Sequence, residues 1–291
     1  MTTVRDALVI WCVEDDRPGH RRQLAGLAAA LQALRHVRIC RIGRGESAAL
    51  LPAPDLILTA GRESHWRGLR YRWHYGGKLV ALMDPGLPRT LFDLSVIPEH
   101  DGIGASDKVL LSAGPLNPVK PASAPDRNKG LRLVGGPSRH YRWSDTDLAA
   151  QMQRLQAALP ELMWTLTTSP RTPASFSRRV RQLANPGLQV VALEETNPDW
   201  LLRQYAHCGV IWVSEDSASM VYESLSCGAA VGILSVPLRR HGRVSKGVQR
   251  LLERGQLLRL QDLETLGKMP LPQPPLQEAT RIAQTISHWL N

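Results

Sequence analysis

Residues 7–42 read ALVIWCVEDDRPGHRRQLAGLAAALQALRHVRICRI, and this stretch decides the fold class. A short apolar run at 7–13 predicts a strand, leucines at helical spacing predict an amphipathic helix over 20–34, and a second apolar run follows at 37–42. Because parallel strands are joined by crossover connections, usually helices, this order predicts a parallel sheet covered by helices on both faces.

The alternation of strands and helices continues along the chain in two series. The 291 residues are enough for two domains. Between the series, residues 115–130 read PLNPVKPASAPDRNKG, a Pro- and Ala-rich stretch without periodicity that is typical of a linker. Apolar runs that predict further strands lie at 56–59, 78–83, 91–96 and 109–112 in the first series, and at 131–134, 163–167, 188–193, 209–213 and 230–234 in the second.

We therefore predict an α/β fold of two doubly wound, Rossmann-like domains that face a cleft. The first domain comprises residues 1–118, and a closing helix at 276–291 packs back on it. A linker covers 119–130, and the second domain covers 131–275. Doubly wound sheets bind ligands outside the carboxyl ends of their strands, so the site is expected in the loops that follow the strands.

Composition favours an anionic partner. The formal net charge is +10, and residues 1–145 hold 21 Lys and Arg against 14 Asp and Glu. Excess positive charge attracts nucleic acid, acidic membrane or phosphorylated small molecules. The sequence lacks both a membrane-spanning apolar run and a signal-peptide layout at its start. Its four cysteines form no C-x-x-C pair, which argues against a zinc or redox site and favours a reducing, cytoplasmic location.

The loop after the first strand, from Glu14 to His20, carries the first chemical cluster. Gly19 permits close approach of the backbone, and the helix start offers free N–H groups to an anion. His20 is either the general base for a sugar or lipid hydroxyl or only a cap of the helix. Asp15 and Asp16 could hold a metal, but paired acids at a helix start usually complement its dipole, so no metal is predicted.

Three loops of the second series suit a phosphate group. They read GGPSRHY at 135–141, TTSPRTP at 167–173 and SEDSASMVYE at 214–223, each after a predicted strand and before a helix. Hydroxyl, glycine and arginine residues in such a place suit a diphosphate, although the same residues also serve as ordinary helix caps. Glu223, two turns into the last helix, is either a ribose-binding carboxylate or a solvated helix acid.

Residues 62–78, RESHWRGLRYRWHYGGK, interleave basic and aromatic side chains. The pattern is compatible with single-stranded nucleic acid, with the surface of an anionic membrane, or with an ordinary surface helix. Nucleic acid is not expected as a partner, because no nucleic-acid-binding module is recognisable. The side chains of this predicted membrane or acceptor patch are Arg62, Trp66, Arg67, Arg70, Arg72 and Trp73.

As a set, these motifs resemble the Elm-type mitochondrial fission family, whose bacterial members are regarded as candidate glycosyltransferases. DDRPGHRRQLAGLAAAL resembles the opening of the family, and LVGGPSRHYRW, TTSPRTP, ETNP and SEDSASMVYES resemble its later motifs in the same order. The resemblance implies a GT-B-like fold, with the acceptor near the first domain and a nucleotide sugar in the second.

Carried over residue by residue, the resemblance implies that Arg17 and Gly19 lie on the acceptor side, beside His20 as the catalytic residue. The residues that it implies around the donor are Gly135, Gly136, Ser138, Arg139, Ser169, Arg171, Asn197, Ser217, Ser219, Met220 and Glu223.

We therefore expect a metal-independent glycosyltransferase that needs no cofactor and moves a sugar from a nucleotide-diphosphate sugar to an acceptor hydroxyl. The acceptor is expected to be lipid-linked or a lipopolysaccharide, and an anionic glycolipid or membrane surface at the inner membrane is the expected partner of a cytoplasmic, peripheral protein. Two alternatives stay open. A nucleotide-sugar epimerase of the same fold would leave residues 62–78 without a purpose, and a non-catalytic adaptor recruited to a membrane would not need converging polar loops.

Overall fold

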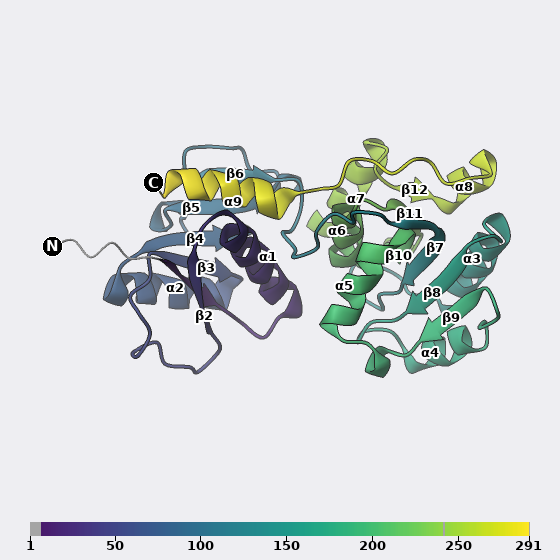
Figure 1. Cartoon of the computed structure of the whole chain (residues 1–291), viewed down its shortest axis with the longest axis horizontal. Coiled ribbons are helices and arrows are strands. Elements are labelled where there is room, and N and C mark those ends of the chain that lie inside the picture. Colours follow the sequence, from purple (N-terminus) through teal and green to yellow (C-terminus); the bar gives the residue numbers. More distant parts are fainter. Residues whose placement is uncertain (1–6, 241, 291) are drawn as a thin grey trace. The chain divides into compact units, whose positions relative to one another are not determined.

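The computed structural model describes residues 7–240 and 242–290, and the chain divides into two compact units (Figure 1). Unit 1 comprises Met1–Pro118 and Gln277–Asn291, and unit 2 comprises Val119–Leu276. Within the described residues, each unit contains a six-stranded parallel sheet flanked by helices. The predicted α/β, Rossmann-like fold class is therefore confirmed.

The sheet of unit 1 has the order β2-β1-β3-β4-β5-β6. Alternate residues of β1 serve the two faces: Ile10 packs with α1 and α9, and Trp11 packs against the α2 side. The strands are β1 (Leu8–Val13), β2 (Val37–Ile42), β3 (Leu56–Ala60), β4 (Lys78–Leu82), β5 (Leu94–Pro98) and β6 (Val109–Ser112), and the helices are α1 (Pro18–Leu34), α2 (Arg62–Tyr75) and α9 (Glu278–Trp289).

The sheet of unit 2 has the order β12-β11-β10-β7-β8-β9, with α3, α4 and α8 on one face and α5, α6 and α7 on the other. The strands are β7 (Asp126–Leu133), β8 (Met163–Thr167), β9 (Leu188–Val191), β10 (Cys208–Ser214), β11 (Ala230–Leu234) and β12 (Leu258–Arg259). The helices are α3 (Asp145–Ala158), α4 (Ala174–Arg181), α5 (Pro198–His207), α6 (Ala218–Cys227), α7 (Arg243–Glu253) and α8 (Leu260–Leu266).

Among the predicted strands, two boundaries differ most from those of the structure. The last part of the predicted linker belongs to β7, which begins at Asp126 rather than at residue 131. Its first residues are polar because they extend the strand beyond the core, where Lys129 pairs with Met163 of β8. The predicted strand at 91–96 begins later, at Leu94, because residues 89–91 form a 3₁₀ turn.

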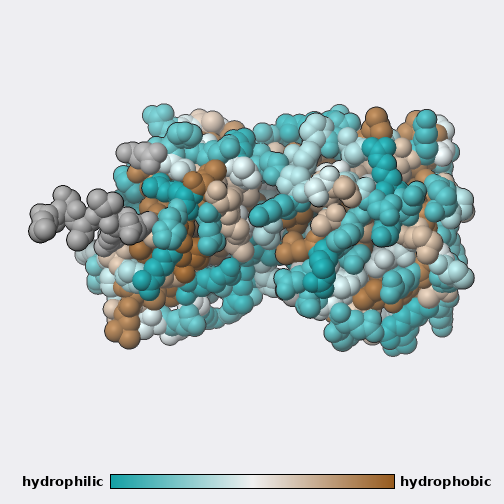
Figure 2. Space-filling view, in the orientation of Figure 1, coloured by the Kyte–Doolittle hydropathy of each residue, from teal (hydrophilic) through white to brown (hydrophobic). Residues whose placement is uncertain are grey.

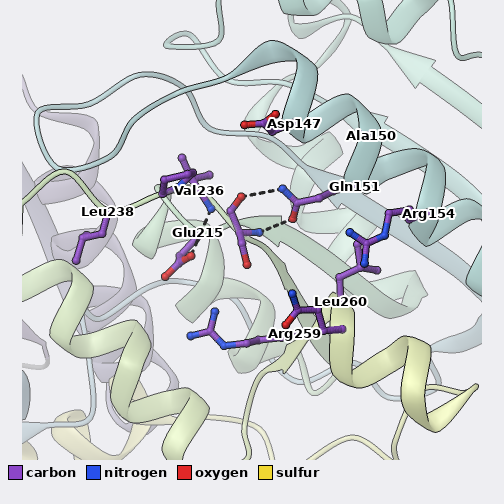
Figure 3. Close-up of a pocket in the computed structure, with 12 residues that line it drawn as sticks. Asp147, Ala150, Gln151, Arg154, Glu215, Val236, Leu238, Arg259 and Leu260 are labelled. Carbon is purple, nitrogen blue, oxygen red and sulfur yellow. Dashed lines mark hydrogen bonds between the residues drawn. The ribbon is translucent and has the colours of Figure 1, made fainter.

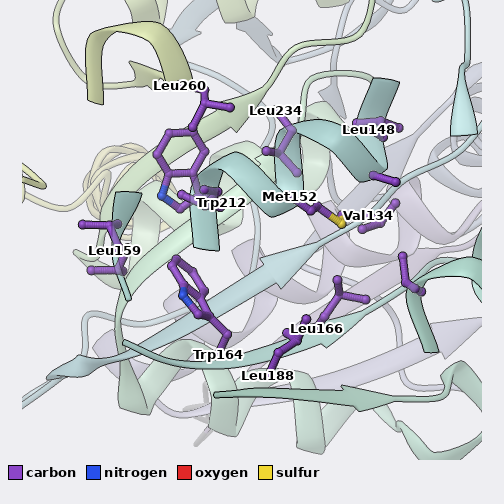
Figure 4. Packing of buried hydrophobic residues seen from close by; sticks show 14 of the residues in the cluster. Val134, Leu148, Met152, Leu159, Trp164, Leu166, Leu188, Trp212, Leu234 and Leu260 are labelled. Atoms are coloured by element: carbon purple, nitrogen blue, oxygen red, sulfur yellow. The ribbon is translucent and has the colours of Figure 1, made fainter. Parts of the chain in front are cut away.

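Two tryptophans fill the core between the sheet of unit 2 and helices α3 and α8 (Figure 4). Trp164 pairs across the ladder with Gly130, and Trp212 pairs with Gly232. A Cβ atom at either glycine would overlap the indole ring beside it, so the glycines provide the space in which the rings lie flat on the sheet. Both indoles are buried, at 2% and 0% exposure.

Arg132 on β7 is buried in this core at 1% exposure. Its guanidinium carbon lies 4.1 Å from the centre of the Trp164 ring, and its nitrogens donate to the Met152 carbonyl (3.3 Å) and to Oε1 of Gln156 (2.6 Å). Among the described residues no carboxylate forms an ion pair with it, and burial lowers its pKa to about 9. The core thus contains a positive charge balanced only by dipoles and a π-system.

We expect Arg132→Met to stabilise unit 2. Methionine fills a similar volume without the cost of desolvating a charge, so the free energy of unfolding should rise by about 1–3 kcal/mol in urea titrations. The matched control is Arg127→Met, an exposed position on the same strand, which should change stability by less than about 0.5 kcal/mol. A loss of stability in Arg132→Met alone would show that the buried charge is a net stabiliser.

In the view of Figure 2, hydrophilic residues predominate on the surfaces of both units, with hydrophobic residues gathered in smaller patches. None of the helices formed by residues 7–240 and 242–290 combines the length and apolar character that a membrane crossing requires.

Candidate active site

A histidine–aspartate pair lies where β1 leads into α1 of unit 1, with Asp15 in the connecting loop and His20 in the first turn of the helix. The His20 Nδ1 atom is 2.6 Å from Oδ2 of Asp15, and the two side chains are 15% and 8% exposed. The Arg17 N–H donates to the other carboxylate oxygen of Asp15 (3.0 Å), which fixes the carboxylate. Because a carboxylate accepts the Nδ1 proton, Nε2 of His20 is the nitrogen that can take a proton from a substrate.

The sequence singled out His20 but not its partner. Asp15 was interpreted as a metal ligand or a dipole-complementing acid, whereas the structure uses both of its oxygens on His20 and Arg17. Asp16 is 65% exposed and lies within 4 Å of two arginines. The sequence could have indicated Asp15 by its position. It lies five residues before His20 and just ahead of a helix start, a spacing that lets the two side chains meet.

Gly61, at the start of α2, makes room for this pair. Its φ is +93°, which favours glycine, and a Cβ atom there would overlap Nδ1 of His20 and lie 2.7 Å from Oδ2 of Asp15. At Gly19, by contrast, a Cβ atom would meet nothing within 4 Å, so no close approach requires glycine there. The end of β3 therefore helps to shape the site that follows β1.

A second histidine, His65, lies buried beside the pair. Its Nδ1 is 2.9 Å from the Thr59 hydroxyl, which itself donates to the Val80 carbonyl (3.2 Å). Burial, followed by the nearby His20, lowers the pKa of His65 to about 4. His65 is therefore neutral at neutral pH and adds no fixed charge next to the His20–Asp15 pair.

In unit 2, the carboxylate of Asp216 joins three loops. Its Oδ2 accepts from the Gly136 N–H (2.8 Å) and from Arg171 Nη2 (2.9 Å), and its Oδ1 accepts from the Ser214 hydroxyl (2.7 Å). Ser214 in turn accepts from the Gly135 N–H (2.7 Å). The loops after β7, β8 and β10 are thereby held together at the carboxyl edge of the sheet, around a side chain with 0% exposure.

The same network fixes several residues that the sequence predicted for the donor. Arg171 also donates to the Gly136 carbonyl (2.8 Å), and the Ser169 hydroxyl donates to the Gly135 carbonyl (2.9 Å). A Cβ atom at Gly135 would overlap the Asp216 carboxylate. Gly135, Gly136, Ser169 and Arg171 are thus brought together, by an aspartate that the sequence did not single out.

The remaining predicted donor residues have varied surroundings. Ser217 precedes α6, and within the described residues its side chain does not cap that helix, so the first N–H groups of α6 stay open to an anion; Ser219 in the first turn is exposed. Met220 is partly buried against the α5–α7 face. The Ser138 hydroxyl accepts from the His140 N–H, and Arg139 is exposed.

Asn197 and Glu223 have structural partners. The Asn197 side chain caps α5 by accepting from the Trp200 N–H (2.7 Å). Glu223 is 2% exposed and accepts from the Tyr205 hydroxyl (3.0 Å), so the solvated-acid alternative was wrong. A ribose contact by Glu223 stays a prediction, and it would require the carboxylate to exchange this partner or share it.

Only part of the predicted patch on α2 faces solvent. Arg67 donates to the carbonyls of Glu14 (2.8 Å) and Gly43 (2.5 Å), and Arg72 donates to Asp93 (3.2 Å), so the placement of both in a docking patch needs correction. Both side chains are therefore engaged by other segments of unit 1. The exposed stripe consists of Arg62, Trp66, Arg70 and Trp73, and the indoles are 56% and 88% exposed.

Two cavities lie beside these loops in unit 2. The larger, about 700 Å³, lies between α3 and the segment after β11 (Figure 3). Gln151 closes one side by pairing with the backbone of Ser235, and burial raises the pKa of Glu215 on its wall. None of the predicted donor residues lines this cavity, whereas Ser169 lines the smaller one, of about 380 Å³. The predicted donor residues therefore make the smaller cavity the better candidate for a donor-binding site.

Metal-ligand geometry is not seen in the described ranges 7–240 and 242–290, where no three His, Cys, Asp or Glu side chains converge.

Comparison with known proteins decides the family. The sequence profile of the mitochondrial fission ELM1 family matches residues 18–290. The chain belongs to this family. Uncharacterized protein RP120 of Rickettsia prowazekii (strain Madrid E) is 31% identical over 114 residues, which is 32% of this chain and 32% of that protein, so the match spans about a third of the relative.

Solved structures show the same fold at low identity. UDP-GlcNAc 2-epimerase from Neisseria meningitidis, bound to UDP-GlcNAc, has a TM-score of 0.59 at 11% identity, covering 97% of this chain and 99% of that one. The Methanocaldococcus jannaschii epimerase in complex with UDP-GlcNAc and UDP scores 0.56 at 10% identity, covering 97% and 100%. Acinetobacter baumannii MurG scores 0.52 at 12% identity, covering 98% of each chain. These likenesses show that the chain has a GT-B fold.

We expect Asp216→Asn to destabilise unit 2. Asparagine cannot accept on both sides, so a bond from Ser214, Gly136 or Arg171 is lost and a buried group stays unsatisfied, at a cost of about 3 kcal/mol. Urea unfolding measures the change, with Asp16→Asn, an exposed aspartate, as the control. Equal stability of the two variants would show that the three loops do not depend on this carboxylate.

Proposed function

We propose that this chain is a glycosyltransferase that moves a sugar from a nucleotide-diphosphate sugar to an acceptor hydroxyl. The observation that carries the proposal is the His20–Asp15 pair at 2.6 Å, at the junction of β1 and α1 in a GT-B fold. An imidazole oriented by a carboxylate is suited to take a proton from a hydroxyl as that oxygen attacks carbon. Unit 1 thus supplies the base, and unit 2 supplies the donor-binding loops.

In this proposal each polar group has one task. Nε2 of His20 takes the acceptor proton, and Asp15 stabilises the imidazolium that forms. The acceptor oxygen bonds to the anomeric carbon while the bond from that carbon to the diphosphate breaks. The departing diphosphate would be stabilised by Arg171, which Asp216 holds in place, and by the N–H groups at the start of α6.

The donor class is supported by the fold and by these loops. The structural relatives named above are described with UDP-GlcNAc or UDP, which motivates UDP-sugars as first ligands. Because Arg171 and a helix start can offset the diphosphate charge, we propose that binding needs no metal. Calorimetric titration of UDP in the presence of a chelator tests this, and binding that requires magnesium or manganese would contradict it.

We expect His20→Ala and Asp15→Asn to lower turnover by about 10²–10⁴-fold while UDP affinity stays within about twofold of wild type. Asparagine at 15 would accept less well from Nδ1 and favour the wrong tautomer of His20. Radiolabel transfer from UDP-[¹⁴C]GlcNAc into a bacterial lipid extract measures turnover, with Asp16→Asn as the control.

The same assay separates the alternatives. Label in the lipid fraction indicates transfer, label that stays on UDP in an epimerised sugar indicates an epimerase, and a protein that binds no UDP-sugar fits the adaptor. Wild-type turnover in both His20→Ala and Asp15→Asn would remove the proposed base.

We also propose that the exposed stripe of α2 docks the protein on an anionic membrane or glycolipid. Its four members repeat at helical spacing, so two arginines and two indoles share one face. Indoles prefer the interface, and each arginine near an anionic surface contributes about 1 kcal/mol. Such attachment is reversible and weakens with salt.

We expect the double variant Arg62→Gln with Arg70→Gln to abolish co-sedimentation with phosphatidylglycerol vesicles at low salt. Replacing Trp66 and Trp73 by Ala should weaken it by a similar amount. The control removes two exposed arginines of unit 2, Arg179→Gln with Arg203→Gln, and should bind as wild type does. Wild-type protein that ignores these vesicles at low ionic strength would favour a water-soluble acceptor.

A further inference from the structure

Two loops of unit 2 pair with each other to form what we call the basic ribbon, residues 138–142 and 237–240. Tyr141 and Leu238 form an antiparallel bridge. The Arg142 N–H donates to the Pro237 carbonyl (2.7 Å), and the Arg239 N–H donates to the His140 carbonyl (2.8 Å). The ribbon therefore joins the loop after β7 to the segment after β11.

Its backbone sorts the side chains onto two faces. Successive residues of an extended chain point to opposite sides, and Tyr141 is buried at 3% exposure. Arg142 and Arg239 therefore share the side away from the core with His140. His140 and Arg239 flank the bridge opposite each other.

The arginines of the ribbon have no acidic partners. Arg139, Arg142, Arg239 and Arg240 are all exposed, and within residues 7–240 and 242–290 none of their guanidinium groups forms an ion pair with a carboxylate. Arg139 instead donates from Nε to Nε2 of His140 (3.0 Å). Four arginines and a histidine thus gather on two short paired segments, and their mutual repulsion is not offset by the fold.

The position of the ribbon indicates which kind of ligand its positive charge could bind. The ribbon begins directly after Gly135 and Gly136, which the Asp216 network holds. A diphosphate carries about two to three negative charges, and the proposed site already supplies Arg171 and the start of α6 for it. Asp216 already offsets the charge of Arg171, whereas within the described residues no carboxylate offsets the ribbon arginines. The ribbon therefore adds unpaired positive charge next to the proposed site and implies further negative charge on a substrate.

We propose that the basic ribbon binds the carboxylate or phosphate of an anionic sugar. If the anionic sugar is the one carried by the nucleotide donor, this inference rests on the proposed function. An anionic saccharide that is not linked to a nucleotide, such as a phosphorylated sugar of an acceptor, offers the same chemistry.

The test compares two ligand pairs that differ in one negative group. UDP-glucuronate is compared with UDP-glucose, and glucose 6-phosphate with glucose, by calorimetry or by NMR titration for weak binding. The variant is Arg239→Gln with Arg240→Gln, and the control is Arg179→Gln with Arg203→Gln, which removes the same charge from exposed positions on α4 and α5. All proteins are full-length.

We expect wild type and control to prefer the anionic member of a pair by about tenfold, and the ribbon variant to lose that preference while its affinity for UDP-glucose stays within about twofold. A preference confined to the UDP-sugars identifies the donor as the source of the charge, and one confined to glucose 6-phosphate identifies a separate saccharide. Either result supports the ribbon.

Equal binding within both pairs, or a preference that survives in the ribbon variant, overturns the inference. The proposed function fails separately, if neither UDP nor any UDP-sugar binds wild type. In that case the glucose 6-phosphate pair still decides whether the ribbon binds an anionic sugar.

Discussion

The buried carboxylate of Asp216 is the constraint on which the polar loops at the carboxyl edge of the unit 2 sheet depend. It accepts from the Gly136 N–H after β7, from the Arg171 guanidinium after β8 and from the Ser214 hydroxyl at the end of β10. Parallel sheets bring the ends of their strands to one edge, but they do not fix the loops that follow. A fully desolvated anion with satisfied partners does so, because moving any one loop would leave part of its charge unpaired in a medium of low dielectric. The glycines beside it follow from the same contact, since a Cβ at Gly135 would take the place of the carboxylate.

In unit 1 an aspartate also holds a functional side chain in place, with fewer hydrogen bonds. Asp15 has one backbone donor and one imidazole, and the open position at Gly61 lets the pair approach the start of α2. In unit 2 the buried acid orients an arginine, and in unit 1 it orients a histidine. Fixed cations suit a phosphate group, whereas an imidazole suits the transfer of one proton, so the two acids prepare their partners for different kinds of chemistry.

The sequence predicted the sheets better than the contacts between their loops. Runs such as 37–42 and 163–167 are strands with the predicted bounds, because apolar side chains within each run are buried in the core. The polar start of β7 carried no such signal and was interpreted as linker. Asp216 was missed for a related reason: an acid before a helix normally complements the dipole, and only the folded loops show that this one is buried. The sequence likewise could not show that Arg67 points toward the sheet, because this depends on how α2 packs against it.

The arginines illustrate why the net charge of a protein indicates the charge of its partner but not where that partner binds. Arg132 lies on an indole in the core, Arg67 holds backbone carbonyls, and Arg171 is tied to Asp216. These groups count toward the formal charge of +10, yet their donors are already used inside the fold. A guanidinium can offer its full hydrogen-bonding capacity to a ligand only where the protein has not engaged it. In the described part of the chain, that condition holds, among other places, on the exposed stripe of α2 and at Arg142, Arg239 and Arg240 of the basic ribbon, so each unit has its own unbalanced positive surface. Each of these surfaces is suited to an anionic partner of its own.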